Sequence, residues 1–184
     1  MIKRISKVFS IILLALVMLS VTGCGNNKAG EKLKTNEDIK SMVETITTKE
    51  AENLPKLNVI DVDLKDSFSL SSFIGIETSE NIEEVVAVEP FISSIPFSLA
   101  FARVSEDADI EKMKSEILEK INMRKWLCVE ADKLYVFNNG NTIVVLMASK
   151  DSVDIVYNDI KEYLENNIGE VLEKTGSNYE NIEE

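Results

Sequence analysis

Apolar residues recur along the chain with two different periods, one typical of helices and one typical of strands. Thr35 and Asp38 form a pair that resembles a capping box, which marks the start of a helix. Pro55 ends any continuation of that helix. The segment 57–76 has no clear period, and we expect a short helix from Leu64 to Phe73 that Gly75 stops. The helix after Thr35 is predicted by four apolar residues on one stripe: Ile39, Met42, Val43 and Ile46.

Two pairs of strands follow, and each pair leads into a helix. Residues 85–92 are typical of a strand that Pro90 marks as an edge or a bulge, and residues 96–104 alternate in strand fashion. Asp107 is expected to cap the next helix. That helix is predicted from the stripe Ile110, Met113, Ile117 and Ile121.

The second pair comprises residues 133–137 and 143–148, joined by a hairpin turn at Asn139-Gly140. Asp151 is expected to cap a final helix that Gly169 or Gly176 ends. The repeated order of two strands and a helix predicts an α+β fold. We expect an antiparallel sheet of about four strands in ββαββα order, with helices packed on one face and one further helix preceding it.

The first 23 residues follow another pattern. Lys3, Arg4 and Lys7 precede 14 residues without a charge, 8–21. As a helix these span about 21 Å, less than the roughly 30 Å hydrocarbon core of a bilayer. The segment is therefore predicted to be a signal peptide, with its positive head on the cytoplasmic side and the rest of the chain exported.

The end of this segment is a motif centred on Cys24. Val21-Thr22-Gly23-Cys24 resembles the bacterial lipobox, in which the cysteine becomes the lipidated N-terminus, so it implies an anchor on the extracytoplasmic face of the cell membrane. Ordinary cleavage that leaves a free thiol, and no cleavage, are the alternatives. On this interpretation residues 24–35 are the lipidated cysteine and a flexible tether, 36–176 a single domain, and 177–184 an acidic tail.

Net charge limits the classes of binding partner that are expected, and the cysteine content limits disulfide pairing. Removal of residues 1–23 from the 184-residue chain leaves 161 residues, with 17 basic and 32 acidic side chains and a formal net charge of −15. This excess argues against nucleic acid and against broad contact with anionic lipid. If Cys24 carries lipid, Cys128 has no cysteine to pair with. We expect Cys128 to be a small buried hydrophobe, with a reactive thiol as the alternative.

The residues available for catalysis are few. The chain has no histidine, which excludes Ser-His-Asp and Cys-His catalysis and zinc sites that use imidazole, and no glycine-rich loop precedes a helix. Asp61, Asp63 and Asp66 have a spacing similar to calcium ligands. They lack the glycine turn and distal glutamate of an EF-hand, so a solvated segment is the preferred interpretation. No cofactor, metal or catalytic residue is predicted, and an enzymatic role is not favoured.

Two residues are candidates for binding a ligand, Phe97 and Arg103. Phe91, Phe97 and Phe101 are candidates for the floor of a binding groove, with core packing as the preferred alternative. Arg103 ends a strand and has the charge to pair with an anionic ligand, with a surface ion pair as the preferred alternative.

A resemblance to a known family rests on the lipobox, on the short tether and on two longer stretches. These stretches are PFSLAFARVSEDADIEKMKSEILEKI and NNGNTIVVLMASKDSVDIVYNDI. Together they resemble a family of uncharacterised lipoproteins with one domain of unknown function in clostridial-type Gram-positive bacteria. The resemblance implies no functional residue, because the family has no known activity. We expect a non-enzymatic, lipid-anchored extracytoplasmic module that binds a protein or envelope component. A small-molecule or cation binder, or a carboxylate-based hydrolase at the cell surface, is the alternative.

Overall fold

Six strands form one antiparallel sheet in the computed structural model, which describes residues 31–126 and 128–177. The strand order is β1-β2-β3-β5-β4-β6, and every neighbouring pair is antiparallel. The described elements are α2 (Asn36–Lys49), β1 (Leu57–Asp61), α3 (Ser67–Ile74), β2 (Ile82–Pro90), β3 (Phe97–Val104), α4 (Ile110–Lys120), β4 (Lys133–Asn139), β5 (Thr142–Ala148), α5 (Lys150–Tyr163) and β6 (Leu172–Thr175).

The mixed α+β class and the antiparallel sheet are confirmed, but the count of four strands is wrong. The four expected strands are β2 to β5, which form the centre of the sheet. The strands at the two edges, β1 and β6, were missed. β1 lies in the segment without a clear period, and β6 lies between the two glycines that were offered as the end of the final helix.

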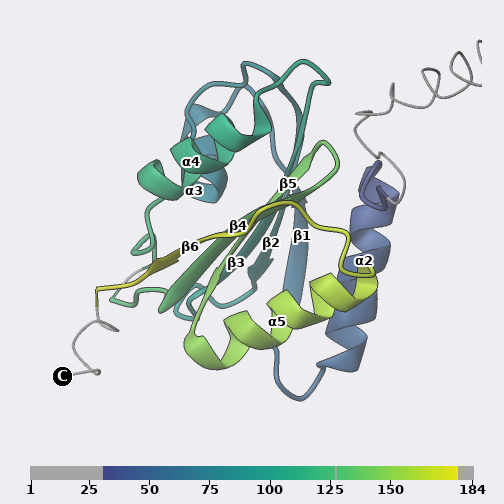
Figure 1. The fold of residues 1–184 in the computed structure, drawn as a ribbon. Helices are drawn as coiled ribbons and strands as arrows, with labels where there is room; N and C mark the ends of the chain where they lie inside the picture. Colours follow the sequence, from purple (N-terminus) through teal and green to yellow (C-terminus); the bar gives the residue numbers. More distant parts are fainter. Residues whose placement is uncertain (1–30, 127, 178–184) are drawn as a thin grey trace, which may run out of the picture.

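The helices cover both faces of the sheet, so the prediction that they pack on one face is wrong (Figure 1). One core lies between the sheet and α2 with α5, and the other lies between the sheet and α3 with α4. The reason is the composition of β3 and β5. Phe101 faces the first core while Ala100 and Ala102 face the second, and β5 is buried at every position. A strand that is apolar on both sides needs cover on both sides.

α4 starts two residues later than expected, and α5 starts two residues earlier. The capping box of Thr35 and Asp38 is present, which confirms the start of α2. The cap of α4 is Asp109, whose side chain accepts a hydrogen bond from the Lys112 N–H, so Asp107 is not the cap. α5 starts after Ser149, so Asp151 lies in its first turn instead of at its cap.

The ends of three elements depend on residues with positive φ. Gly75, at φ 71°, ends α3 as expected. The final helix ends at Tyr163, before either expected glycine, because Glu165 and Asn166 adopt φ of 55° and 61°. The hairpin between β4 and β5 is confirmed, with a shift of one residue. Its two loop residues are Gly140 and Asn141, and of these Gly140 has positive φ.

The segment 31–35, which we call the strap, contacts the domain instead of belonging to a flexible tether. Leu33 is fully buried in the core under α2 and α5. Cys24, the rest of the expected tether, the signal peptide and residues 178–184 of the expected tail lie outside the described residues. Within the described residues, no helix is long and apolar enough to cross a membrane.

Cys128 is exposed and adopts φ 66°, so the expectation that it is a small buried hydrophobe is wrong. Trp126, two residues earlier, is 9% exposed and belongs to the core under α3 and α4. The tryptophan is therefore buried while the cysteine is exposed.

Candidate functional site

Phe97 begins β3 and lies in the core between the sheet and α2 with α5. Its side chain is 1% exposed, and Phe101 on the same face is fully buried. Both residues therefore pack in the core, as the preferred alternative to a binding role predicts. Neither has surface to offer to a ligand in this structure.

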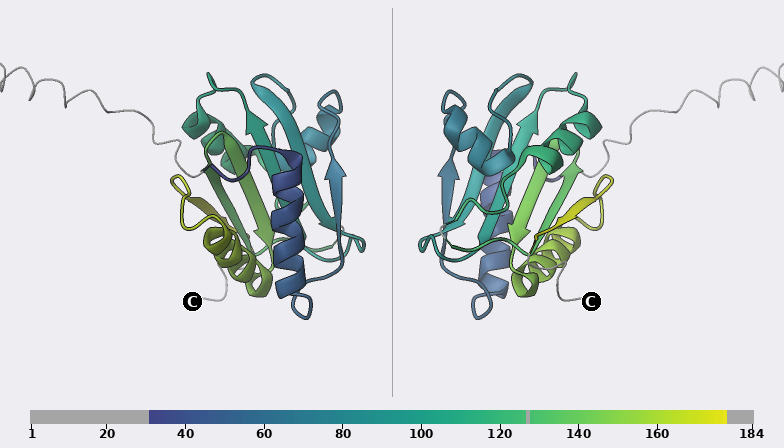
Figure 2. Two further views of the ribbon diagram at one scale, coloured as in Figure 1. Left: turned by 90° about the vertical axis from the view of Figure 1, so that its right-hand side faces the viewer. Right: turned by 90° about the vertical axis from the view of Figure 1, so that its left-hand side faces the viewer.

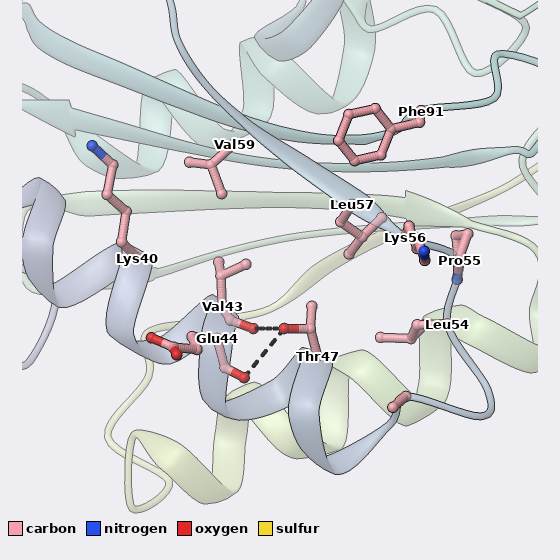
Figure 3. A pocket seen from close by; sticks show the side chains of 11 residues that line it. Lys40, Val43, Glu44, Thr47, Leu54, Pro55, Lys56, Leu57, Val59 and Phe91 are labelled. Atoms are coloured by element: carbon pink, nitrogen blue, oxygen red, sulfur yellow. Dashed lines mark hydrogen bonds between the residues drawn. The ribbon is translucent and has the colours of Figure 1, made fainter.

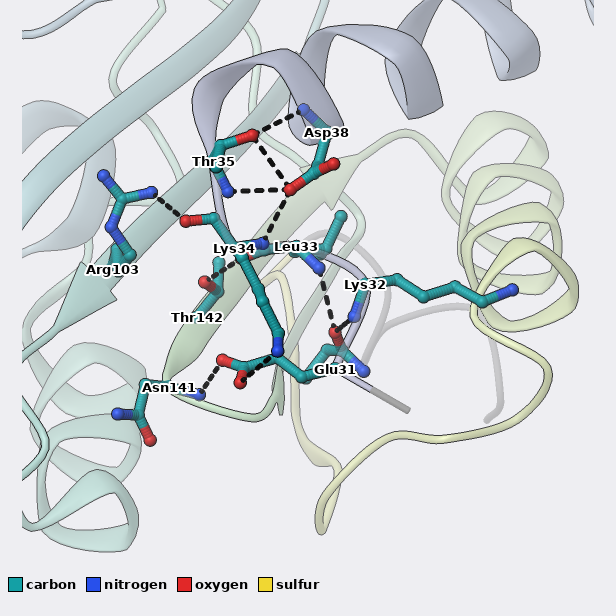
Figure 4. Close-up of polar contacts among 10 residues, drawn as sticks. Glu31, Lys32, Leu33, Lys34, Thr35, Asp38, Arg103, Asn141 and Thr142 are labelled. Atoms are coloured by element: carbon teal, nitrogen blue, oxygen red, sulfur yellow. Dashed lines mark hydrogen bonds and ion pairs between the residues drawn. The ribbon is translucent and has the colours of Figure 1, made fainter. Parts of the chain in front are cut away.

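Arg103 lies near the end of β3 and is held by three partners. Its guanidinium forms an ion pair with Glu84 on β2, and Nε lies 3.8 Å from a carboxylate oxygen of Glu83. Nη1 donates a hydrogen bond of 2.7 Å to the carbonyl oxygen of Lys34 in the strap (Figure 4). The arginine thus connects the strap to the sheet, and no ligand role is needed to explain its position.

A groove lies between α2 and the edge strand β1, and it contains neither Phe97 nor Arg103. Its volume is about 530 Å³, within the range of ligand-binding clefts. Figure 3 shows Val43 and Thr47 on α2 facing Leu57 and Val59 on β1 across it. The loop residues Leu54 and Pro55 close one end, and Phe91 contributes its ring from the end of β2.

The middle of the helix wall, at Val43 and Thr47, is apolar because of how Thr47 is bonded. Its hydroxyl donates to the carbonyl oxygen of Val43 at 2.8 Å and lies 3.2 Å from that of Glu44. The hydroxyl is therefore satisfied within its own helix. Val43 beside it is 5% exposed, and Leu57 and Val59 opposite are half-buried.

The strand wall of the groove carries free backbone groups. β1 lies at the edge of the sheet, and among the described residues it pairs with β2 alone. Val62 N–H donates to Val85 and Phe91 N–H donates to Lys56. Bonded residues alternate in an antiparallel ladder, so the backbone groups of residues 57, 59 and 61 point away from β2. An open edge beside an apolar groove is a surface on which another extended chain can pair.

Phe91 is a large apolar residue of the groove that is exposed to solvent. It is 71% exposed, and the next residue, Ile92, is 62% exposed, although both are large and apolar. The aromatic cluster of the sequence therefore divides, since Phe91 lines a groove while Phe97 and Phe101 fill the core. The signal was present in the sequence, but the period alone does not show which aromatic residue lies outside.

The charges around the groove are two lysines and a glutamate. Lys40 Nζ lies 3.6 Å from Asp61 across the groove, and Glu44 lines its helix wall. Lys56 is exposed and forms no ion pair with another described residue. In a chain with a formal net charge of −12, a cation that has no ion pair within the described part of the chain and lies beside an apolar groove favours a ligand with a negative group.

The aspartates that resemble calcium ligands have structural partners. Asp61 pairs with Lys40, Asp63 accepts the Lys65 N–H at 2.9 Å, and Asp66 caps α3. Hydrogen bonds from Ser69 hold the pKa of Asp66 below its ordinary value. The part of the chain that the structure describes contains no group of three Asp, Glu or Cys side chains placed to hold a metal ion.

One further acidic pair lies between α2 and α5. Lys49 Nζ lies 2.6 Å from Asp159 and 2.9 Å from Glu162, and the hydrogen bond to Asp159, followed by that to Glu162, raises the pKa of the lysine. The single cation pairs with both carboxylates, which lie on α5. The pair therefore serves to hold α2 against α5.

Comparison of the chain with known proteins adds no further constraint. No family model, no curated protein and no solved structure matches it. The resemblance to clostridial-type lipoproteins stays a prediction. The conclusion on function therefore depends on the groove, the edge strand and the N-terminal motif of this chain.

Proposed function

We propose that this protein is a lipid-anchored extracytoplasmic module that binds an extended segment of an envelope protein in the groove between α2 and β1. The observation that carries the proposal is the position of the groove beside the free edge of β1. An extended chain that pairs with an edge strand obtains its affinity from backbone hydrogen bonds. It obtains its specificity from alternate side chains that enter a neighbouring groove.

The chemistry of the groove describes the segment. Leu57 and Val59 line the groove with their side chains and expose their backbone groups at the edge, so one segment can use both. The apolar walls favour apolar side chains at alternate positions of the bound chain. Lys56, which has no ion pair among the described residues, favours a carboxylate at the end of the segment that lies beside Phe91.

The anchor makes the first prediction. Cys24→Ser removes the only atom in the motif that accepts a thioether-linked lipid, so the protein is expected to shift almost entirely from the membrane fraction to the soluble or precursor fraction. Fractionation of cells with detection of the mature and precursor forms measures this. Cys128→Ser is the matched control and is expected to leave the distribution unchanged. Normal maturation and membrane retention of Cys24→Ser would contradict the anchor.

The groove makes the second prediction. In Val59→Pro the missing N–H is one that faces away from β2, so the change spares the ladder with β2 and removes a donor for the bound segment. We expect affinity to fall about tenfold or more, since one lost backbone hydrogen bond accounts for about 1 kcal/mol and the proline ring blocks close approach. Peptides selected from a displayed random library on the vesicle-bound protein serve as probes, with fluorescence anisotropy as the readout.

The control for Phe91 is Phe68→Ala, because Phe68 is also an exposed aromatic residue, at 81% against 71%, and does not line the groove. It is expected to leave peptide affinity unchanged, whereas Phe91→Ala is expected to lower it. Unchanged melting temperatures would show that both variants are folded. If selected peptides bind Val59→Pro and the unmodified protein equally, or if methylation of their backbone nitrogens has no effect, binding by strand addition is wrong.

A further inference from the structure

We propose that the strap orients the domain on the membrane, with the β4–β5 hairpin toward the bilayer and the Phe91 end of the groove away from it. This inference rests on the lipid anchor at Cys24 in the proposed function. It concerns how the groove is presented to its partner.

The strap is bound to the hairpin end of the sheet by its backbone. Asn139 Oδ1 accepts the N–H groups of Lys32 and Leu33 at 2.8 and 3.2 Å. Thr142 Oγ1 donates to the carbonyl oxygen of Leu33 at 2.6 Å in a fully buried position. These bonds join segments more than 100 residues apart, so they attach the N-terminal segment to the end of β4 and the start of β5.

Side chains reinforce the attachment on two sides. Glu31 Oε1 accepts the backbone N–H of Asn141 at 3.0 Å, and Arg103 reaches the carbonyl oxygen of Lys34. Lys32 Nζ lies 2.9 Å from the carbonyl oxygen of Tyr163 and 2.8 Å from a carboxylate oxygen of Glu165. With the buried side chain of Leu33, the strap has fixed contacts at each residue from 31 to 34 (Figure 4).

The attachment limits how far the domain can move from a lipid on Cys24. Cys24 and Glu31 are seven residues apart, and seven residues span at most about 25 Å when fully extended. A flexible chain of that length has a mean reach of only about 15 Å. Because this short segment enters the domain at one end of the sheet, that end is held near the headgroups.

The groove extends in the opposite direction. α2 runs from the strap toward the far end of the sheet (Figure 2), and its 14 residues cover about 21 Å. Phe91 follows the end of β2 at that far end, where Ser149 N–H donates to Pro96. Phe91 and Lys56 are thus displaced from the hairpin by roughly the length of a strand of seven or eight residues, about 25 Å. A partner segment reaches the groove from the exterior and not from the bilayer surface.

Energy transfer to the membrane tests the orientation. The full-length lipidated protein in a Cys128→Ser background carries a donor dye on a new cysteine, and phosphatidylcholine vesicles carry an acceptor dye on their headgroups. The near position is Asp107→Cys, in the exposed loop after β3, and the distal position is Ser94→Cys, in the exposed loop before β3. We expect transfer from residue 107 to be at least twofold more efficient than from residue 94.

A second variant lengthens the tether without touching the strap. Insertion of 12 Gly and Ser residues after Gly25 raises the mean reach from about 15 Å to about 25 Å. The difference between the two positions is then expected to shrink, while membrane binding is retained. Equal transfer from residues 107 and 94 with the native tether would overturn the orientation. Failure of the labelled protein to bind vesicles, or binding that survives Cys24→Ser, would instead refute the anchor.

Discussion

Lys125→Ala is expected to lower the free energy of unfolding by about 3 kcal/mol, because it leaves a largely buried carboxylate without its cation. Lys125 Nζ lies 2.6 Å from Glu89 on β2, and it donates to Ser98 Oγ at 2.9 Å and to the Ser72 carbonyl oxygen at 3.2 Å. The lysine and glutamate side chains are only 9% and 16% exposed. Burial lowers the pKa of Lys125, although Glu89 opposes that effect. Urea unfolding followed by Trp126 fluorescence measures the loss.

Two further variants separate the lost charge pair from other effects. Lys125→Met combined with Glu89→Leu removes both charges and is expected to recover much of the loss, since a buried ion pair contributes little beyond an apolar pair of similar size. Lys120→Ala breaks the exposed pair with Glu116 at 2.7 Å and is expected to change stability little. A loss below about 1 kcal/mol in Lys125→Ala would show that Glu89 is well solvated without its partner.

Gly75→Ala is expected to lower the free energy of unfolding by about 2–4 kcal/mol, through backbone conformation and steric overlap. Gly75 ends α3 at φ 71°. A Cβ atom there would lie 2.7 Å from the backbone nitrogen and 2.9 Å from the Cα atom of Ile121. The backbone after α4 cannot move aside, because Ile121 N–H donates to Ile117 and its side chain is buried. Thermal and urea unfolding measure the effect.

Gly140→Ala is the matched control, because Gly140 has a similar φ of 56°. A Cβ atom at this position would meet the side chain of Glu31, which can rotate away, and not a backbone atom. The expected loss is therefore the conformational cost of about 1–2 kcal/mol, with about 1 kcal/mol more from the hydrogen bond that Glu31 accepts from the Asn141 N–H. Equal losses in the two variants would mean that the contact with Ile121 adds nothing to the role of Gly75.

The candidate site was predictable only in part. The sequence grouped Phe91, Phe97 and Phe101 as possible groove residues, and Phe91 alone lines the groove. Strand alternation does not decide which faces are covered by helices, so it cannot separate a core phenylalanine from one at a strand end. The contact of Arg103 with the strap was not predictable either, because its partner Lys34 lies 69 residues away in the sequence.

The sequence by itself determined the elements whose signal is local. The capping box of α2, the glycine stop of α3, the hairpin between β4 and β5 and the four central strands all depend on residues within a few positions of each other. Local preference and hydrophobic period are sufficient for such elements. The N-terminal motif that predicts an anchor at Cys24 is local as well, and the anchor stays a prediction.

Only the tertiary structure decided the two edge strands, the helices on both faces, the groove and the strap. β1 and β6 have five and four residues and obtain their hydrogen bonds from β2 and β4, so little in their own sequence marks them. The strap contains one large apolar residue, Leu33, and a tether is the natural expectation from its composition. Its place is set by Asn139 and Thr142, which fold next to it from more than 100 residues away. A period in the sequence reports which side of an element is apolar, whereas the partner that covers that side is selected when the whole chain packs.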